Sequence, residues 1–118
     1  MDKGIVLITH GSKRKKSNDV FLDLVSKIDE RREEKVLPAY MQFSEPALED
    51  SVNELLKSRI EEIVVVPIFL FPGKHATRDI AKKVEKMDKQ YGDVDFEIRK
   101  TIAPHEKLLD IIDDRIDN

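Results

Sequence analysis

Each of the three histidines in the chain follows an apolar run rich in β-branched residues. The runs are Gly4–Thr9 before His10, Ile63–Phe71 before His75, and Val94–Ile98, continuing to Ile102, before His105. In an open parallel α/β sheet, ligands bind outside the carboxyl ends of the strands, so such runs would gather the imidazoles at one edge. A neutral imidazole can accept a proton near neutral pH or bind a transition metal. The pattern therefore predicts a site for acid–base or metal chemistry.

Glycine and cationic residues surround two of these histidines. His10 is followed by Gly11, Ser12, Lys13 and Arg14, and His75 lies in a predicted loop, 72–79, with Gly73, Lys74, Thr77 and Arg78. Glycine lets backbone amides approach a ligand, and lysine and arginine form charge-assisted hydrogen bonds with anions. The segment after His10 is not a phosphate-binding loop, because it lacks a second glycine and a Gly-Lys-Ser/Thr ending.

Three further polar residues have a structural interpretation beside a functional one. Glu45 follows the apolar run Val36–Phe43 and is either a site carboxylate or a favourable charge near a helix amino terminus. His105 follows Pro104 and is either a site residue or an exposed residue at a helix start. Asp79 either caps a helix or contributes to the site.

Length and composition narrow the class of protein. A chain of 118 residues suits one domain, 1–118, with a core of modest size. With no cysteine, any bound metal must be held by imidazole or carboxylate. Acidic residues outnumber basic ones by 24 to 21, which argues against a nucleic-acid binder. No apolar stretch approaches a membrane span and no signal peptide is visible, so we expect a cytoplasmic protein without a membrane partner.

Segments of helical period separate the apolar runs. They start near Asn18, Pro46, Asp79 and Pro104, which are residue types common at helix starts. The side chains expected to point inward are Val20, Phe21, Leu24, Val25 and Ile28 in the first helix, and Leu108, Leu109, Ile112 and Ile116 in the last. Four βα units with right-handed crossovers predict an α/β fold with a single doubly wound parallel sheet.

Two prolines inform the strand order. Pro38 removes a hydrogen-bond donor from the second strand, which should therefore lie at an edge of the sheet. The third run is almost wholly apolar, as expected of a central strand covered on both faces, and Pro67 within it predicts a bulge.

Four motifs occur in order along almost the whole chain. They are Thr9-His10-Gly11-Ser12-Lys13 with Asn18, Ser44-Glu45-Pro46-Ala47-Leu48, Pro67-Ile68-Phe69-Leu70-Phe71-Pro72-Gly73-Lys74-His75 with Asp79-Ile80, and Pro104-His105. Together they resemble the CbiX/SirB sirohydrochlorin cobaltochelatases of the class II chelatases, most of all the small single-domain form. The resemblance implies a chelatase-like (flavodoxin-like) three-layer sandwich.

The resemblance also implies a reaction. A divalent metal would be inserted into sirohydrochlorin, a tetrapyrrole rich in carboxylates, without nucleotide hydrolysis and without an organic cofactor. His10 and His75 would handle the metal and accept the pyrrole protons, with Glu45 as a further candidate metal ligand. The expected substrate-binding residues are Gly11, Ser12, Lys13, Arg14, Gly73, Lys74, Thr77 and Arg78, with His105 as an accessory candidate. Co2+ is the expected metal and Ni2+ or Fe2+ are the alternatives, because all three suit imidazole.

The chain departs from the family pattern in places. Lys13 replaces a frequent arginine and keeps the charge, whereas Ala103 stands where glycine is common before Pro104 and leaves the role of His105 open. Ser58-Arg59 replaces a usual glycine.

Two other functions and one assembly state follow from the same residues. The first alternative is a non-catalytic carrier of metal or tetrapyrrole. The second is a histidine-dependent phosphotransferase, although Thr9 stands where such an enzyme would have an arginine.

The size of the substrate predicts an assembly. A macrocycle needs a broad cleft and one short chain offers half of it, so we expect a homodimer with the substrate between facing strand ends.

Overall fold

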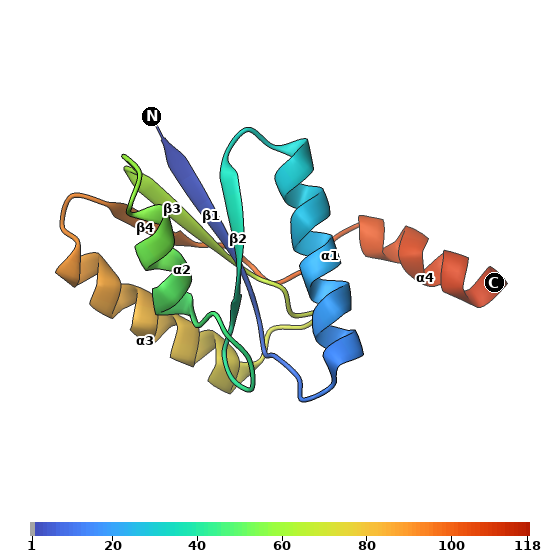
Figure 1. Cartoon of the computed structure of the whole chain (residues 1–118). Helices are drawn as coiled ribbons and strands as arrows, with labels where there is room; N and C mark the ends of the chain where they lie inside the picture. The colour runs from blue at the N-terminus through green and yellow to red at the C-terminus, as the bar shows by residue number, and fades with distance from the viewer. Residues whose placement is uncertain (1) are drawn as a thin grey trace.

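The computed structural model describes residues 2–118, in which strands and helices alternate. The strands are β1 (Lys3–Thr9), β2 (Lys35–Tyr40), β3 (Glu62–Pro67) and β4 (Asp95–Ile98). The helices are α1 (Lys15–Arg31), α2 (Leu48–Leu55), α3 (Lys74–Gln90) and α4 (Lys107–Asp117). All strand pairs are parallel, and the strand order is β2-β1-β3-β4 (Figure 1). The predicted α/β fold with four βα units is confirmed.

Strand β1 supplies both hydrophobic cores. Ile5 and Leu7 pack in a core with α1 on one face of the sheet, and Val6 and Ile8 pack in a larger core with α2 and α3 on the other. Successive side chains of a strand point to opposite faces, so a fully apolar strand requires cover on both sides. The result is a three-layer arrangement of helix, sheet and helices.

The positions of the prolines in the sheet agree with one prediction and correct another. β2, which contains Pro38, is an edge strand as predicted. β3 is interior and largely buried, as predicted, but Pro67 is its last residue and forms no bulge. A proline has no amide to donate, so it is tolerated where the ladder stops.

Both strands that precede long loops are shorter than their apolar runs. β2 ends at Tyr40, and the chain then turns through Phe43, whose φ of 69° is in the left-handed region. After β3, the amide of Ile68 still donates to the carbonyl of Ile8 at 2.7 Å, and residues 69–71 lie in a loop. Apolar residues that the sequence assigned to strands therefore belong to the carboxyl edge of the sheet.

Two helices begin before their predicted caps. α1 begins at Lys15 and α3 at Lys74, so Asn18 and Asp79 lie inside helices and do not cap them. His75 is consequently in the first turn of α3 and not in a free loop. Within residues 2–118, no helix is both long and apolar enough to cross a membrane.

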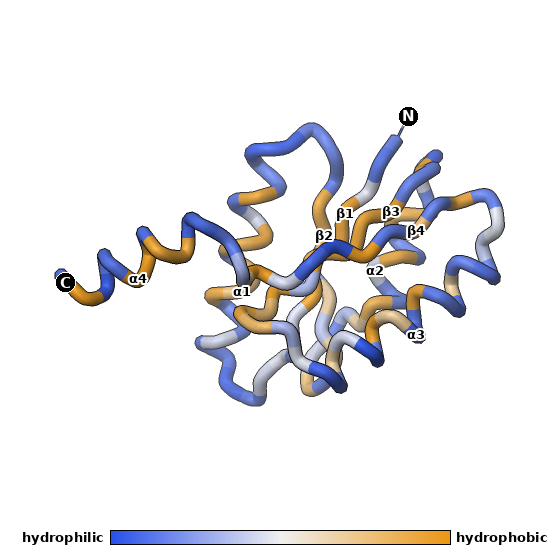
Figure 2. The backbone as a smooth tube through the Cα atoms, turned by 180° about the vertical axis from the view of Figure 1, so that it is seen from behind, coloured by the Kyte–Doolittle hydropathy of each residue, from blue (hydrophilic) through white to orange (hydrophobic). Residues whose placement is uncertain are grey.

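The prediction for the last helix is wrong. α4 was expected to turn its apolar side chains inward, yet none of its residues is buried, and Leu109 and Ile116 are 65% and 74% exposed. Figures 1 and 2 show α4 extending away from the body of the molecule, beyond α1.

Helix α1 also buries fewer of its apolar residues than predicted, because Val20 and Leu24 are exposed. Periodicity identifies an apolar face but not the surface that covers it.

Candidate functional site

His10 emerges directly from the carboxyl end of β1 and lies on an aromatic support. Its imidazole stacks on the ring of Phe69, with ring centroids 4.4 Å apart and an interplanar angle of 22°. Phe69 is buried, whereas His10 is exposed. The stacking orients the imidazole and leaves it accessible to a ligand, as a base or a transient metal ligand requires.

Gly11 allows the loops after β1 and β2 to touch. Its φ is +92°, and a Cβ atom built on it would lie 2.0 Å from the carbonyl oxygen of Gln42. The Gln42 amide in turn donates to the carbonyl of His10 at 3.0 Å. No other residue type combines a positive φ with such close approach at low cost, so Gly11 fixes the backbone that carries the imidazole.

Asn18 joins the same two loops through its side chain. Its Oδ1 accepts from the amide of Ser12 at 3.1 Å, and its Nδ2 donates to the Ser12 carbonyl and to Ser44 Oγ, both at 2.8 Å. Ser12 Oγ also accepts from the amide of Arg14 at 3.0 Å. From the sequence, Asn18 was expected to cap a helix because of its type and position. Its role in linking these two loops was not predicted.

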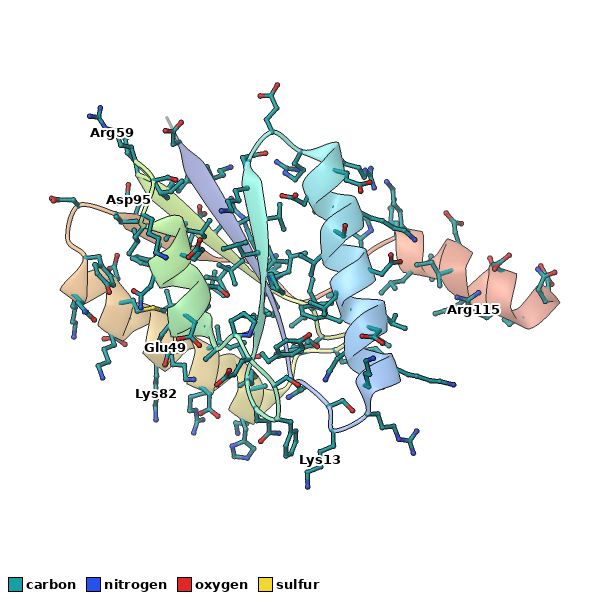
Figure 3. All side chains as sticks on the ribbon, in the orientation of Figure 1. Lys13, Glu49, Arg59, Lys82, Asp95 and Arg115 are labelled. Atoms are coloured by element: carbon teal, nitrogen blue, oxygen red, sulfur yellow. The ribbon has the colours of Figure 1, made fainter. Side chains whose placement is uncertain are left out.

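Exposed apolar side chains lie beside the cationic loop. Phe43, Leu70 and Phe71 are 58%, 53% and 69% exposed, and they follow β2 and β3 at the carboxyl edge. The ammonium of Lys13 lies over the Phe43 ring, 5.2 Å from its centroid. Figure 3 shows Lys13 at the end of the molecule opposite Arg59 and Asp95. Exposed rings next to a cation can bind a flat apolar ligand with an anionic rim.

These apolar residues are not among the site residues expected from the sequence. Their hydrophobic character indicated strand or core, and only the early ends of β2 and β3 expose them. A signal was present in the sequence, since Phe43, Leu70 and Phe71 all precede a predicted loop with charged residues.

The second histidine lies in the first turn of α3. His75 is exposed, and the preceding Gly73 has an extended backbone that accepts a hydrogen bond from Thr77 N at 3.0 Å. Lys74, Thr77 and Arg78 line a shallow surface groove together with Pro72. The early start of α3 thus places the expected substrate-binding residues of this segment on one exposed helix surface.

His105 has a local structural role. Its Nδ1 accepts a hydrogen bond from the amide of Lys107 at 3.1 Å, and its carbonyl accepts from the amide of Leu108 at 3.1 Å. These bonds satisfy amides at the start of α4, which helix geometry leaves without partners. The structural alternative considered for His105 therefore has direct support.

Glu45 is exposed in the loop between β2 and α2, next to Ser44. Among residues 2–118, no three histidine, aspartate or glutamate side chains are grouped closely enough to hold a metal ion together. His10, His75 and Glu45 therefore do not form a closed metal cage within one chain. An open set of donors suits an ion that has to be released.

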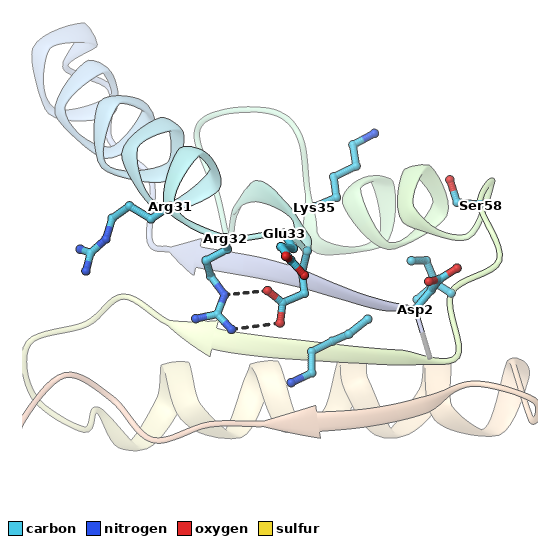
Figure 4. Close-up of a pocket in the computed structure, with 9 residues that line it drawn as sticks. Asp2, Arg31, Arg32, Glu33, Lys35 and Ser58 are labelled. Carbon is cyan, nitrogen blue, oxygen red and sulfur yellow. Dashed lines mark hydrogen bonds and ion pairs between the residues drawn. The ribbon is translucent and has the colours of Figure 1, made fainter.

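A large cavity lies away from the histidines. It has a volume of about 730 Å³ and is lined mainly by charged residues around the start of β1 and the α1–β2 turn (Figure 4). Arg32 forms two hydrogen bonds of 3.0 Å with Glu34 there, and this pairing raises the pKa of Arg32 and lowers the pKa of Glu34. One cation of its lining, Arg32, is already paired with a carboxylate, and the lining contains no histidine.

A comparison with models of protein families finds a match over almost the whole chain. The CbiX family model matches residues 4–118, which include the His10 loop, the start of α3 and His105. The chain belongs to the CbiX family.

Curated relatives carry both iron and cobalt in their names. The chain is 32% identical over 114 residues to the chloroplastic sirohydrochlorin ferrochelatase of Arabidopsis thaliana, covering 96% of this chain and 51% of that protein. The chain thus spans about half the length of this relative. It is 27% identical to the sirohydrochlorin cobaltochelatase of Methanocaldococcus jannaschii, covering 96% of each.

Solved structures share the fold. A cobalamin (vitamin B12) biosynthesis CbiX protein from Marinobacter aquaeolei VT8 superposes with a TM-score of 0.86 at 29% identity, covering 98% of this CbiX-family chain and 94% of that one. The sirohydrochlorin chelatase SirB of Bacillus subtilis subspecies spizizenii, in complex with cobalt, superposes with a TM-score of 0.92 at 22% identity. The match covers 99% of this chain and 50% of the SirB chain.

Proposed function

We propose that this CbiX-family chain is a sirohydrochlorin chelatase that inserts a divalent metal into the tetrapyrrole without nucleotide hydrolysis. The observation that carries the proposal is the exposed His10 imidazole, stacked on Phe69 beside the two loops that bear Lys13 and Phe43. This arrangement places a base, an aromatic surface and a cation at one edge of the sheet. The names of the relatives support sirohydrochlorin as the substrate class.

The reaction requires a base and an open metal-binding position. Two pyrrole protons leave the ring, the ring nitrogens replace water on the metal, and the net products are the metallated ring and two protons. His10 accepts pyrrole protons or transiently binds the metal, and His75 shares these tasks. Glu45 adds a carboxylate near the metal. Cobalt is the proposed metal, since the relatives named as cobaltochelatases include one covered over nearly its whole length; nickel and iron are the alternatives.

The substrate's carboxylates need cationic and polar partners. We assign this role to Lys13, Arg14, Lys74 and Arg78, which form charge-assisted hydrogen bonds, and to Ser12. The remaining contacts come from Gly11, Gly73 and Thr77. The apolar rings of Phe43 and Phe71 offer a surface for the face of the macrocycle.

The proposed working form is a cytoplasmic homodimer with one macrocycle between two carboxyl edges. One chelatase-like domain offers an exposed, one-sided surface, and the SirB chain that matches it is about twice as long. Twofold symmetry would supply opposed histidines and a second set of cations.

An anaerobic insertion assay tests the proposal. The protein is mixed with sirohydrochlorin and Co2+, Ni2+ or Fe2+ in turn, and the rate of the change in the absorption spectrum is compared with that of a reaction without protein. Turnover of many equivalents of substrate is the expected result. Binding without acceleration would instead indicate the metal or tetrapyrrole carrier.

A further inference from the structure

Phe43 has a backbone conformation that is unfavourable for its side chain. Its φ of 69° is in the left-handed region, and among residues 2–118 it is the one residue other than glycine with a positive φ. Glycine or asparagine adopts this conformation with less strain than a bulky aromatic residue. Strained residues persist where the surrounding structure holds them, and they cluster at active sites and ligand clamps. The conformation of Phe43 therefore indicates a function for its ring.

Hydrogen bonds fix the chain on both sides of Phe43. The amide of Gln42 donates to the carbonyl of His10 at 3.0 Å, and Oγ of Ser44 accepts from Nδ2 of Asn18 at 2.8 Å. These bonds tie the loop after β2 to the loop after β1 and to α1. The side chain held between them is not packed into the core, since Phe43 is 58% exposed. The ring is therefore displayed at the carboxyl edge, in the loop that is bonded to the backbone of His10.

The ammonium of Lys13 covers this ring. Its Nζ lies 5.2 Å from the centroid of Phe43, and the contact is attractive because the face of an aromatic ring is electronegative. Lys13 is exposed, and within residues 2–118 it forms no ion pair with a carboxylate. An ammonium in this position occupies a face on which a flat ligand would otherwise stack. It is also the group that a carboxylate of the same ligand would attract.

A carboxylated tetrapyrrole has both features that this pair can recognise. Its macrocycle is flat and apolar, which suits an exposed ring, and the carboxylates of its rim bind an ammonium more strongly than a neutral ring does. Because Phe43 and His10 lie in loops that are bonded to each other, a macrocycle on Phe43 would also lie beside the proposed base. The identity of this ligand rests on the proposed function.

We propose that one face of the tetrapyrrole stacks on Phe43, and that Lys13 covers this ring until a carboxylate of the substrate draws the ammonium away. Binding is then an exchange of partners: Lys13 leaves the ring for a carboxylate, and the ring leaves the ammonium for the macrocycle. A flat ligand with carboxylates gains both new contacts, whereas a flat ligand without charge has to displace the ammonium and gains only one. The pair therefore selects for carboxylated macrocycles.

Phe43→Asn tests the stacking and the strain together, because asparagine tolerates a positive φ. The Kd for sirohydrochlorin, measured by anaerobic absorption titration without metal, is expected to rise about tenfold when the ring is lost. The urea midpoint should equal or exceed that of wild type, because the strain is relieved and few buried contacts are lost. Unchanged affinity in the folded variant overturns the proposal. A lowered midpoint also overturns it, since Phe43 would then be a structural residue.

Two further variants complete this measurement. Phe71→Asn is the control for strain, because Phe71 is 69% exposed in a loop but has no positive φ, so its urea midpoint should not rise. An equal rise in both asparagine variants overturns the role of strain. Phe43→Trp keeps a flat ring and should keep the Kd within about threefold of wild type. If Phe43→Trp binds as weakly as Phe43→Asn, the stacking is overturned.

Lys13→Met tests the exchange through a change of sign. Sirohydrochlorin itself should bind about tenfold more weakly to this variant, because a carboxylate loses its cation. The fully methylated ester of sirohydrochlorin, which has the same macrocycle without the charges, should bind about threefold more tightly, because the ring is uncovered. Lys86→Met is the matched control: Lys86 is exposed in the last part of α3, and its loss should leave both values of Kd unchanged. If the ester does not bind Lys13→Met more tightly than wild type, the exchange is overturned.

These measurements separate the stacking from the proposed function. A wild-type chain that binds sirohydrochlorin with these sensitivities but inserts no metal contradicts only the chelatase activity. A wild-type chain that inserts metal, while Phe43→Asn keeps full affinity, contradicts only the stacking. Absence of any binding of sirohydrochlorin to the wild-type chain overturns both.

Discussion

The imidazole of His10 and the ring of Phe69 are stacked 4.4 Å apart, which joins the ends of two neighbouring interior strands, β1 and β3. We propose that His10 supplies the chemistry and that Phe69 holds the plane of its imidazole. The pair therefore distinguishes a residue that reacts from a residue that positions it, and the two should respond differently to substitution.

His10→Ala and His75→Ala are each expected to remove most of the insertion activity and leave the fold intact, because both side chains are exposed. A loss of about a hundredfold is expected for removal of a general base. The double variant should be little worse than either single one. The initial rate of metal insertion is measured anaerobically, with circular dichroism as the folding control. Near-normal turnover in either folded variant would show that its histidine is not catalytic.

Phe69→Leu should lower turnover by up to about tenfold, since an aromatic pair contributes roughly 0.5–1.5 kcal/mol beyond burial. Phe69→Tyr keeps a stacked ring and should restore most of the rate if its hydroxyl is tolerated. Steady-state kinetics should show the change mainly in kcat, because Phe69 positions the base. An unchanged kcat in Phe69→Leu, with a stable fold, would argue against the positioning role.

Gly11→Ala is expected to destabilise the protein by roughly 1–3 kcal/mol and to displace the His10 loop. The new methyl group would meet the Gln42 carbonyl and would also require a φ that alanine disfavours. Gly92→Ala is the matched control, since a Cβ atom added to Gly92 would have no neighbour within 4 Å. Urea denaturation of both variants measures the difference. Equal stability of the two variants would mean that the loops after β1 and β2 move apart to accommodate the added methyl group without cost.

Tyr40 should make stability depend on pH in the alkaline range. Burial, followed by the nearby charge of Asp19, raises the pKa of Tyr40 above its usual 10.0. The unfolded chain therefore ionises this phenol first, so its contribution to stability is full below pH 10 and is lost as pH rises through the folded pKa. Denaturation midpoints across this range should fall less steeply for Tyr40→Phe than for wild type. An equal dependence of the midpoint on pH in the two proteins would contradict the raised pKa of Tyr40.

Glu45→Gln and His105→Ala are expected to reduce the rate by graded amounts, with the larger effect for Glu45. The carboxylate of Glu45 is exposed and free to act, whereas Nδ1 of His105 accepts a hydrogen bond from the amide of Lys107. The rate at several metal concentrations measures both effects. A His105→Ala variant as inactive as His10→Ala, with α4 still helical by circular dichroism, would give His105 a catalytic part.

The sequence by itself determined the parallel α/β fold, the edge position of β2 and the place of His10 directly after the first strand, whereas His75, expected in a loop, lies in the first turn of α3. These features depend on local signals: apolar runs separated by segments of helical period, a proline that cannot donate in a ladder, and motifs at the ends of the runs. The same signals predicted the cations of the proposed site, because Lys13 and Lys74 lie within those motifs.

Only the tertiary structure decided which surfaces meet. Asn18, which the sequence indicated as a helix cap, links two loops, and Phe69, which it indicated as a strand residue, supports an imidazole. The inward face predicted for α4 is exposed, since the chain before it is bonded to the loop after β3. A hydrophobic pattern indicates that a side chain favours burial. Which surface buries it depends on contacts between residues far apart in sequence, and no local pattern contains those contacts.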